Sequence, residues 1–281
     1  MHSVVVTGVS TGIGWGITKV LLQHGFRVFG SVRKAQDAER LTAEFGEAFV
    51  PLVFDVTDGA AVTAAAQQVR AQQHGETLFG LVNNAGIAVP GPLMHLPVDG
   101  FRYQLEVNLV SVLSVTQALL PLLGTDRSLR GKPGRVVNIS SVSGTIGYPF
   151  VGAYAASKHG LEGFSETLRR ELMLYGIDVI IIGPGSVATP IWDKAEQADM
   201  SLYGETDYLE SARRAQEFMI WNGRRGLPAE KIGEVVLRAL TVPRPKVRYA
   251  VVRESFLTRF LIHVLPKRVI DTVIARNLGF K

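Results

Sequence analysis

The sequence contains no cysteine among its 281 residues. Disulfide bonds and cysteine-ligated metals are therefore excluded. Its six histidines are scattered without a metal-ligand spacing such as H-x-x-x-H, so we predict no metal site.

Apolar runs stay shorter than the roughly 18 residues of a membrane-spanning helix. The apolar pattern begins at Ser3 with no basic leader before it, so we expect a cytoplasmic protein without a signal peptide.

Charge and composition restrict the partners. The formal net charge is +5, and hydrophobic residues make up 47% of the chain. A basic surface can attract nucleic acid, acidic membrane or a phosphorylated cofactor, or can simply be solvated. Basic residues do not alternate with aromatic ones as they do in nucleic-acid modules, so we predict no nucleic-acid partner. With no repeat or low-complexity linker, we expect one domain over residues 1–281.

Short apolar runs alternate with segments of helical spacing. Because the runs are almost continuously apolar, they predict parallel strands covered by helices on both faces. The fold class expected is therefore α/β, a single doubly wound parallel sheet of the Rossmann type with a helical extension. The boundary between the sheet core and this extension is expected between residues 189 and 190. The expected strands are 3–7, 26–32, 49–54, 78–82, 135–139, 178–182 and 248–252; the longest expected helices are 101–123 and 153–175.

A glycine-rich turn follows the first expected strand. Gly8, Gly12 and Gly14 have the spacing G-x-x-x-G-x-G, which differs from the commoner G-x-G-x-x-G of dinucleotide sites. Backbone N–H groups in such a turn, together with the following helix N-terminus, can hold a pyrophosphate. The same glycines also suit a tight turn with no ligand.

The end of the second expected strand bears on the choice of cofactor. NAD-binding folds usually have an acidic residue there for the ribose 2′-hydroxyl. This chain has Arg33 and Lys34 instead. Two cations can pair with a 2′-phosphate, arginine with two parallel hydrogen bonds. This pattern favours NADP, with NAD as the alternative.

Tyr154 and Lys158 lie four residues apart in an expected helix and so share one face. A phenol has a pKa near 10, and a nearby ammonium group lowers it, which makes the tyrosine a usable general acid or base. Ser141 follows the fifth strand, at the sheet edge where ligands of such folds bind. Its hydroxyl could donate to a carbonyl oxygen beside Tyr154.

Taken together, these motifs resemble the short-chain dehydrogenase/reductase family, most strongly from Ser3 to about Thr189. The resemblance is carried by the following motifs, in chain order: Thr7-Gly8-x-x-x-Gly12-Ile13-Gly14, Asn83-Asn84-Ala85-Gly86, Asn108, Ser141, Tyr154-x-x-x-Lys158 and Pro184-Gly185. The family spacing of 13 residues to the tyrosine selects Ser141 over Ser140 and Ser143.

The resemblance implies a role for each matched residue. Tyr154 would exchange the proton, Lys158 would bind the nicotinamide ribose, Ser141 would polarise the substrate oxygen, and Asn108 would hold a relay water. The residues implied to contact the cofactor are Gly8, Ser10, Thr11, Gly12, Ile13, Gly14, Arg33, Asp55, Val56, Asn84, Ala85, Gly86, Tyr154, Lys158, Pro184, Gly185, Val187 and Thr189. The resemblance also implies that residues 2–189 form the dinucleotide-binding and catalytic core, and that residues 190–281 form a helical substrate-binding extension with a substrate lid and carboxyl-terminal extension. A homodimer or homotetramer is expected by analogy.

Bulky apolar residues predict a lipophilic ketone or secondary alcohol as the substrate. They fall in segments 89–96, 142–151 and 190–226, and comprise Val89, Leu93, Met94, Ile146, Tyr148, Phe150, Ile191, Trp192 and Met219. Segment 255–280 is both apolar and basic, as in steroid- and retinoid-type members. It could touch a membrane surface, cover a pocket or dock on a core.

Three other functions compete with an NADP-dependent carbonyl reductase. One is an NAD-dependent alcohol or steroid dehydrogenase. Another is a non-catalytic NADP-sensing scaffold, since fold does not fix function. The third is a sugar-nucleotide epimerase or dehydratase, which usually has a longer carboxyl-terminal domain than the residues after Pro190 provide.

Overall fold

Seven parallel strands form the central sheet of the computed structural model, which describes residues 1–197, 201–253 and 265–280. The strand order is β3-β2-β1-β4-β5-β6-β9, and every neighbouring pair is parallel. The order reverses direction at β1, the topological switch point of a doubly wound sheet. The predicted α/β fold class is confirmed, whereas the boundary between residues 189 and 190 stays a prediction.

The strands are short, and most match the apolar runs in the sequence. Their bounds are β1 Ser3–Val6, β2 Arg27–Val32, β3 Phe49–Val53, β4 Gly80–Asn83, β5 Arg135–Ile139, β6 Asp178–Pro184, β7 Val187–Ala188, β8 Leu227–Pro228 and β9 Arg248–Val251. The α-helices are α1 Gly12–Gln23, α2 Ala35–Phe45, α3 Gly59–Gln73, α4 Val98–Leu105, α5 Ser111–Leu119, α6 Gly152–Glu171, α7 Ile191–Glu196, α8 Leu209–Arg224, α9 Ala229–Thr241 and α11 Lys267–Leu278.

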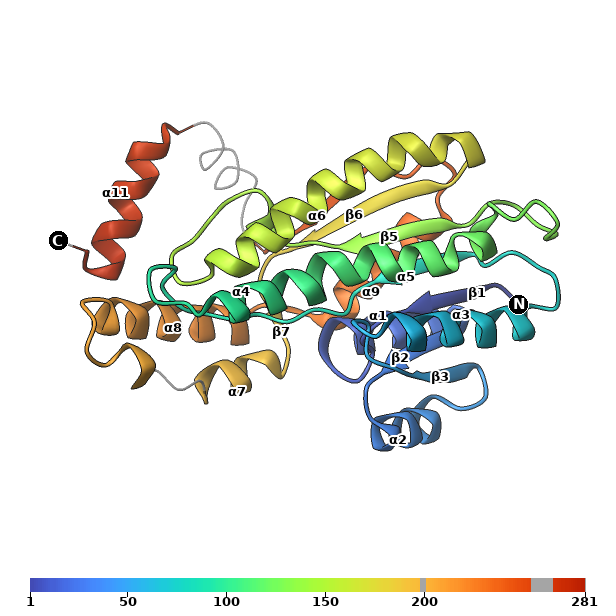
Figure 1. Ribbon diagram of the computed structural model, residues 1–281, viewed down its shortest axis with the longest axis horizontal. Helices are drawn as coiled ribbons and strands as arrows, with labels where there is room; N and C mark the ends of the chain where they lie inside the picture. The colour runs from blue at the N-terminus through green and yellow to red at the C-terminus, as the bar shows by residue number, and fades with distance from the viewer. Residues whose placement is uncertain (198–200, 254–264, 281) are drawn as a thin grey trace.

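Successive side chains of a strand point to opposite faces of the sheet, and both faces are buried. Val4 and Val6 of β1 join a core that contains side chains of α1 and α9. Val5 joins a second core with side chains of α3, α5 and α6. Helices therefore cover both faces (Figure 1), and this is why the strands read as continuous apolar runs rather than alternating ones.

Two long helices predicted from spacing are interrupted. The segment 101–123 consists of α4, a π-helical turn at Glu106–Val110, α5 and a short 3-10 helix at Pro121–Leu123. The segment 153–175 is α6 followed by a 3-10 helix at Leu172–Tyr175. A π-helical turn inserts only one residue into a helix, and this changes the spacing of apolar residues very little. The sequence pattern therefore did not predict it.

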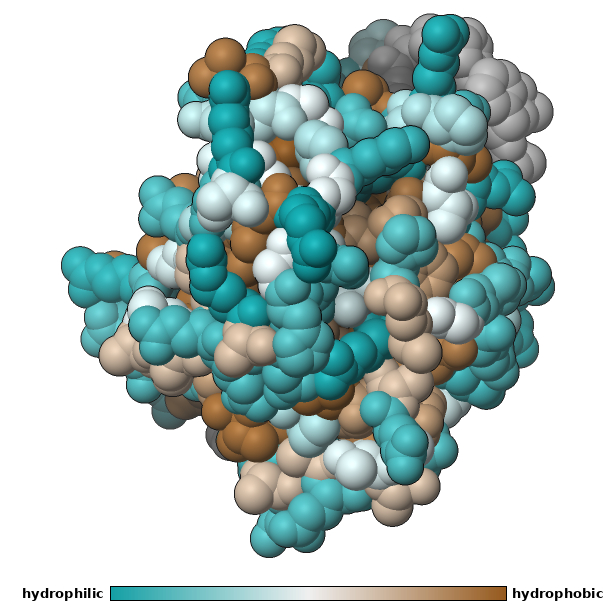
Figure 2. All heavy atoms as spheres, turned by 90° about the vertical axis from the view of Figure 1, so that its right-hand side faces the viewer, coloured by the Kyte–Doolittle hydropathy of each residue, from teal (hydrophilic) through white to brown (hydrophobic). Residues whose placement is uncertain are grey.

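The carboxyl ends of the strands lie toward the left of Figure 1, together with α7, α8 and α11. Figure 2 views the opposite end of the molecule, where hydrophilic side chains cover much of the surface with apolar ones scattered among them. The predicted segment 255–280 is described only in part, because residues 254–264 lie outside the described residues. Within the described ranges, none of the helices combines the length and the apolar character that crossing a membrane requires.

Candidate active site

The turn between β1 and α1 has the geometry of a phosphate cradle. Gly8 and Gly12 have φ of 70° and 64°, in the left-handed region that favours glycine. Thr11 stands at the helix N-cap without a side-chain capping bond, and the first turn contains no acidic residue. The leading N–H groups of α1 are therefore not capped by a side chain. They fit the diphosphate of a dinucleotide.

Side chains from β1 and from the end of β4 lock this turn. Thr7 Oγ1 accepts hydrogen bonds from the backbone N–H of Asn84 and Ala85, at 2.9 and 3.0 Å. Asn84 Nδ2 donates to the carbonyls of Thr7 and Gly8, at 2.8 and 3.0 Å. A Cβ on Gly8 would lie 2.8 Å from Ala85 Cα, so only glycine fits there. Asn84 and Ala85 therefore shape the predicted cofactor edge, and Thr7, which had no predicted role of its own, holds them in place.

The segment after β6 closes over the same turn. Gly185 N donates to Val251 O at 2.9 Å, which fixes the chain just beyond Pro184. Val187 is buried and pairs with β8. The Gly12 Cα faces Thr189: a Cβ built there would lie 3.4 Å from the threonine side chain. The two ends of the predicted cofactor site thus meet across the carboxyl edge of the sheet.

Charged groups gather where the adenosine end of the cofactor is expected. Arg33 is exposed, and its charge helps to lower the pKa of Asp55. The larger cause of that lowering is the hydrogen bond from Thr57 N, at 2.9 Å, while burial opposes it. Val56 is buried in the second core. Arg40 was not predicted; its guanidinium donates to Ser10 O at 2.7 Å and also pairs with Asp37 and Glu44 of α2.

Ser141 and Tyr154 meet at the end of β5. Ser141 is 8% exposed, and its hydroxyl accepts a hydrogen bond from Ser143 N at 3.1 Å. Burial raises the pKa of Tyr154 above its ordinary value, and hydrogen bonding with the Ser141 side chain opposes that rise. The structure thus places the Ser141 side chain near Tyr154, and their catalytic roles stay predictions. The lowering of the Tyr154 pKa by Lys158 stays a prediction.

Lys158 lies one helical turn beyond Tyr154 and points back to the sheet. Its ammonium group donates to Ile139 O at 2.8 Å and lies 5.7 Å from the centroid of the Tyr154 ring. Burial lowers the pKa of Lys158 to about 8, against the opposing charge of Glu162. An ammonium that titrates near neutral pH is suited to proton exchange.

Asn108 occupies the centre of the π-helical turn and is almost fully buried. Its Oδ1 accepts from Ile87 N at 2.9 Å, and its Nδ2 donates to Ile87 O at 3.0 Å and to Ser157 Oγ at 3.2 Å. Gly86 lies against it, since a Cβ there would sit 3.3 Å from Asn108 Oδ1. The side chain thus ties the segment after β4 to the residue next to Lys158. The predicted relay water is a separate matter and stays a prediction.

An ion pair beneath the site was not predicted from the sequence. Arg248 of β9 pairs with Glu162 of α6 through two hydrogen bonds, at 2.9 and 3.1 Å, and its Nη2 also lies 3.4 Å from Ser141 O. Glu162 lies one helical turn after Lys158, so the sequence could have indicated that the two side chains share one face of the helix. Arg248 is 86 residues from its partner, so only the folded sheet reveals it.

The residues predicted to choose the substrate do not share one environment. Tyr148, Phe150 and Met219 belong to a small apolar cluster that includes Leu278 of α11. The Trp192 indole donates to Val187 O at 2.7 Å. Other predicted residues are mostly exposed, including Leu93, Met94 and Ile191. Part of the predicted lining therefore holds the helical extension together.

Comparisons with known proteins identify relatives of the chain. The family model for short chain dehydrogenases matches residues 2–200. An NADPH-dependent 3-dehydrocapnine reductase of Ornithobacterium rhinotracheale is 38% identical over 278 residues, covering 99% of this chain and 98% of the relative. Human retinol dehydrogenase 5 is 34% identical over 288 residues, covering 96% and 87%.

A solved structure agrees with the sequence relatives. The crystal structure of a short-chain dehydrogenase from Streptomyces avermitilis superimposes with a TM-score of 0.77 at 25% identity, covering 99% of this chain and 97% of that one. These matches confirm the predicted resemblance and the prediction of an oxidoreductase. This chain belongs to the short-chain dehydrogenase family.

Proposed function

We propose that this protein transfers a hydride between NADP(H) and a lipophilic ketone or secondary alcohol, with Tyr154 as the general acid or base. The observation that carries the proposal is the meeting of Ser141, Tyr154 and Lys158 at the carboxyl end of β5. This is the edge where ligands of doubly wound sheets bind.

Each of these side chains has a chemical task in the proposal. The phenol of Tyr154 gives its proton to the carbonyl oxygen in reduction and accepts it in oxidation. Ser141 donates a hydrogen bond to that oxygen and so holds it at the phenol. Lys158, with a pKa of about 8, holds a proton beside Tyr154 and stabilises the phenolate. When bound, the nicotinamide supplies or accepts the hydride.

The remaining residues would hold the cofactor. The Gly8–Gly14 turn would take the diphosphate, Asp55 and Val56 the adenine, and Pro184–Thr189 the nicotinamide end. Asn108 would position Lys158 through Ser157. A relay water at Asn108 is part of the proposal.

NADP is the cofactor that the charges favour. Arg33 and Lys34 follow β2, at the end expected to meet the adenosine ribose. Arginine can pair with a 2′-phosphate through two hydrogen bonds. The Ornithobacterium relative is named as an NADPH-dependent reductase, which supports the same choice. NAD is the alternative, and a direct comparison of affinities decides between them.

The scaffold alternative predicts binding without turnover. It is disfavoured because Asn108, Ser141, Tyr154 and Lys158 are all present, and the last three meet at one place. An epimerase or dehydratase is disfavoured by family membership. A homodimer or homotetramer is proposed by analogy with the family.

The test is oxidation of NADPH and NADH by the purified protein with long-chain ketones, retinal and small hydrophilic aldehydes. Tyr154→Phe should reduce kcat/KM by about 10²–10⁴-fold, the usual contribution of general acid–base catalysis. NADPH affinity should change little. Tyr175→Phe is the matched control, because Tyr175 packs against the second core, away from the site.

Full activity in Tyr154→Phe would overturn the assignment. NADPH binding with no turnover of any carbonyl would favour the scaffold. Turnover confined to small hydrophilic substrates would overturn the lipophilic substrate class.

A further inference from the structure

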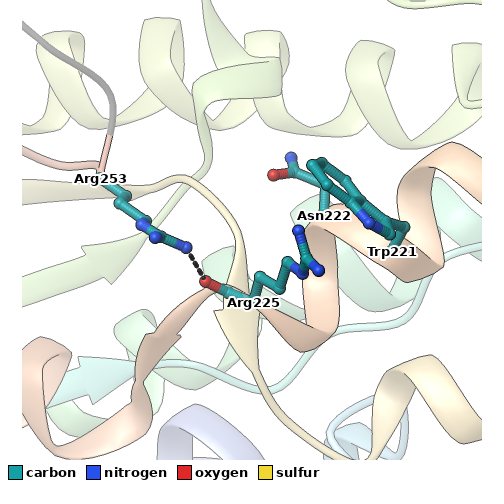
Figure 3. Close-up of a pocket in the computed structure, with 4 residues that line it drawn as sticks. All are labelled: Trp221, Asn222, Arg225 and Arg253. Atoms are coloured by element: carbon teal, nitrogen blue, oxygen red, sulfur yellow. Dashed lines mark hydrogen bonds between the residues drawn. The ribbon is translucent and has the colours of Figure 1, made fainter.

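A hollow of about 540 Å³ lies beside the end of α8 (Figure 3). Trp221, Asn222 and Arg225 line one side, and Arg253 lines the other. Arg253 follows β9, whose last residue pairs with the last residue of β6. The hollow is therefore at the carboxyl edge of the sheet, the same edge as the candidate active site.

A hydrogen bond connects the hollow to the segment that closes over the cofactor turn. Asn222 Nδ2 donates to Ser186 Oγ at 2.8 Å. Ser186 directly follows Pro184 and Gly185, which are expected to enclose the nicotinamide end. A molecule in the hollow would thus lie next to that segment.

Two guanidinium groups in the hollow are held by uncharged partners. Arg225 stacks on the Trp221 indole at 4.4 Å from the ring centroid, and Arg253 Nη1 donates to Arg225 O at 2.7 Å. Neither forms an ion pair with a carboxylate in the described parts of the chain. The neighbouring Arg224, by contrast, pairs with Asp193 and Glu196.

This difference indicates which chemical group would suit the hollow. Arg225 and Arg253 line the same hollow, so an anion bound there would be attracted by both guanidinium groups. Arginine also suits oxyanions geometrically, since its planar fork matches a carboxylate, sulfonate or phosphate. The same helix adds an apolar approach, because Phe218 and Trp221 are both about half exposed and lie one turn apart.

We propose that Arg225 and Arg253 bind an acidic group on the substrate, so that the substrate is an amphiphilic ketone or alcohol carrying a carboxylate, sulfonate or phosphate. The assignment to substrate rests on the proposed function. The cofactor is the other source of phosphate on this molecule. Its expected 2′-phosphate partner, Arg33, follows β2, and four strands (β1, β4, β5 and β6) stand between β2 and β9.

Binding without turnover tests this assignment. The protein saturated with NADP⁺ is titrated calorimetrically with decane-1-sulfonate, with decan-1-ol and with inorganic sulfate. The variants are Arg225→Gln, Arg253→Gln, the double variant and Arg244→Gln. Arg244 is exposed and precedes β9, so it lies at the amino edge of the sheet and is a matched control.

Decane-1-sulfonate should bind the wild type, and each single variant should weaken it by about tenfold, as expected for one charge-assisted hydrogen bond. The double variant should lose about 100-fold by the same reasoning. Arg244→Gln should bind as the wild type does, and NADPH affinity should be the same in all of them.

Equal affinity in the double variant would overturn the proposal, as would equally tight binding of decan-1-ol. Sulfate bound as tightly as the alkylsulfonate would assign the hollow to a free anion and overturn the substrate role. A loss of NADPH affinity instead would assign it to the cofactor. None of these measurements needs turnover. The binding result therefore stays valid even if the Tyr154 test contradicts the proposed function.

Discussion

Two regions meet at the carboxyl edge of the sheet, and they are built differently. The first comprises the turns after β1, β4 and β5 and the π-helical turn, where hydrogen bonds with backbone groups fix the side chains of Thr7, Asn84, Asn108 and Ser141. In the second, the helical extension of α7, α8 and α11, aromatic contacts and exposed charges predominate.

The difference separates two requirements of one enzyme. Proton and hydride transfer depend on geometry to fractions of an ångström, which backbone hydrogen bonds can maintain. Recognition of a substrate needs shape and charge at a larger scale. Side chains on helices outside the sheet can supply these without disturbing the reacting atoms.

The largest expected effect is a steric change in the first region. In Gly14→Ala, the new Cβ would overlap the Gly8 carbonyl oxygen and lie close to Asn84 Nδ2. We expect a loss of more than about 3 kcal/mol in the free energy of unfolding, above the usual cost of overpacking because backbone must move. Cofactor affinity should fall with it, as measured by urea unfolding and NADPH fluorescence.

Gly163→Ala is the matched control for this change. Gly163 lies in α6, where an added Cβ would meet nothing within 4 Å. The substitution should stabilise the protein by about 0.5–1 kcal/mol, the usual difference between alanine and glycine in a helix. Equal effects of the two substitutions would contradict a closely packed turn.

A pH-dependent effect should follow from Lys158. Burial lowers its pKa from 10.5 to about 8. Between these values the unfolded chain binds a proton that the folded protein does not, so this residue makes stability rise as the pH increases. The full gain is about 3.5 kcal/mol, at roughly 1.4 kcal/mol per pKa unit, and about 2 kcal/mol of it falls between pH 8 and pH 10. Urea unfolding of the wild type and of Lys158→Met at pH 8 and pH 10 measures it.

The Lys158→Met variant should lack this gain while keeping the pH response of all other groups. If both proteins changed stability equally between the two pH values, Lys158 would have an ordinary pKa.

A smaller effect is expected for the ion pair between Glu162 and Arg248, which ties α6 to β9. Their side chains are 16% and 24% exposed, so Glu162→Gln should cost about 2 kcal/mol, less than a fully buried pair. Because Glu162 raises the pKa of Lys158, the basic limb of the pH–rate profile that reflects Lys158 should move to lower pH. Steady-state kinetics across pH 6–10 measure this shift.

Glu166→Gln provides the comparison, since Glu166 is one turn further along α6 in an exposed pair with Arg170. It should change stability by less than about 0.5 kcal/mol and leave the profile in place. A shift of the profile in both variants would mean that any negative charge on α6 affects the pKa of Lys158, and that the position of Glu162 next to Lys158 is not the cause.

The smallest effect should come from Phe150, which precedes α6 and packs against the second region. Phe150 contacts Tyr208 edge-on at 6.1 Å and Phe280 at 6.2 Å between ring centroids. Phe150→Leu keeps the apolar character but loses these contacts, at a cost of about 1 kcal/mol. NADPH affinity should not change, whereas KM for a long-chain ketone should. A changed NADPH affinity would show that the two regions are not separable.

Sequence patterns predicted the first region well because its determinants are local. Glycines at fixed spacing and residues at strand ends can be recognised once the strands are identified. The structure places Ser141 near Tyr154. The role of each residue stays a prediction. The cross-links of Thr7 and the pair of Arg248 were missed, because their partners are distant in sequence and become neighbours only in the folded sheet.

The second region was harder for a physical reason. Segment 190–226 contains α7 and α8, and α8 alone extends over 16 residues. The residues that it buries are small, so large apolar side chains do not mark the buried face in the sequence: Ser211, Ala212, Ala215 and Gly223. Phe150 and Met219 were predicted to line a substrate site, and the structure also gives them a packing role. Composition alone does not distinguish the two.

The π-helical turn at Glu106–Val110 has a consequence for how this chain can vary in length. One extra residue in a helix rotates everything beyond it by about 100°. Here that rotation allows Asn108 to reach Ile87 while Val115 and Leu119 still face the second core. Deleting one residue would align the helix but misdirect one of these two sets. The segment should therefore accept many substitutions but almost no insertion or deletion. The number of its residues is constrained more tightly than their identity.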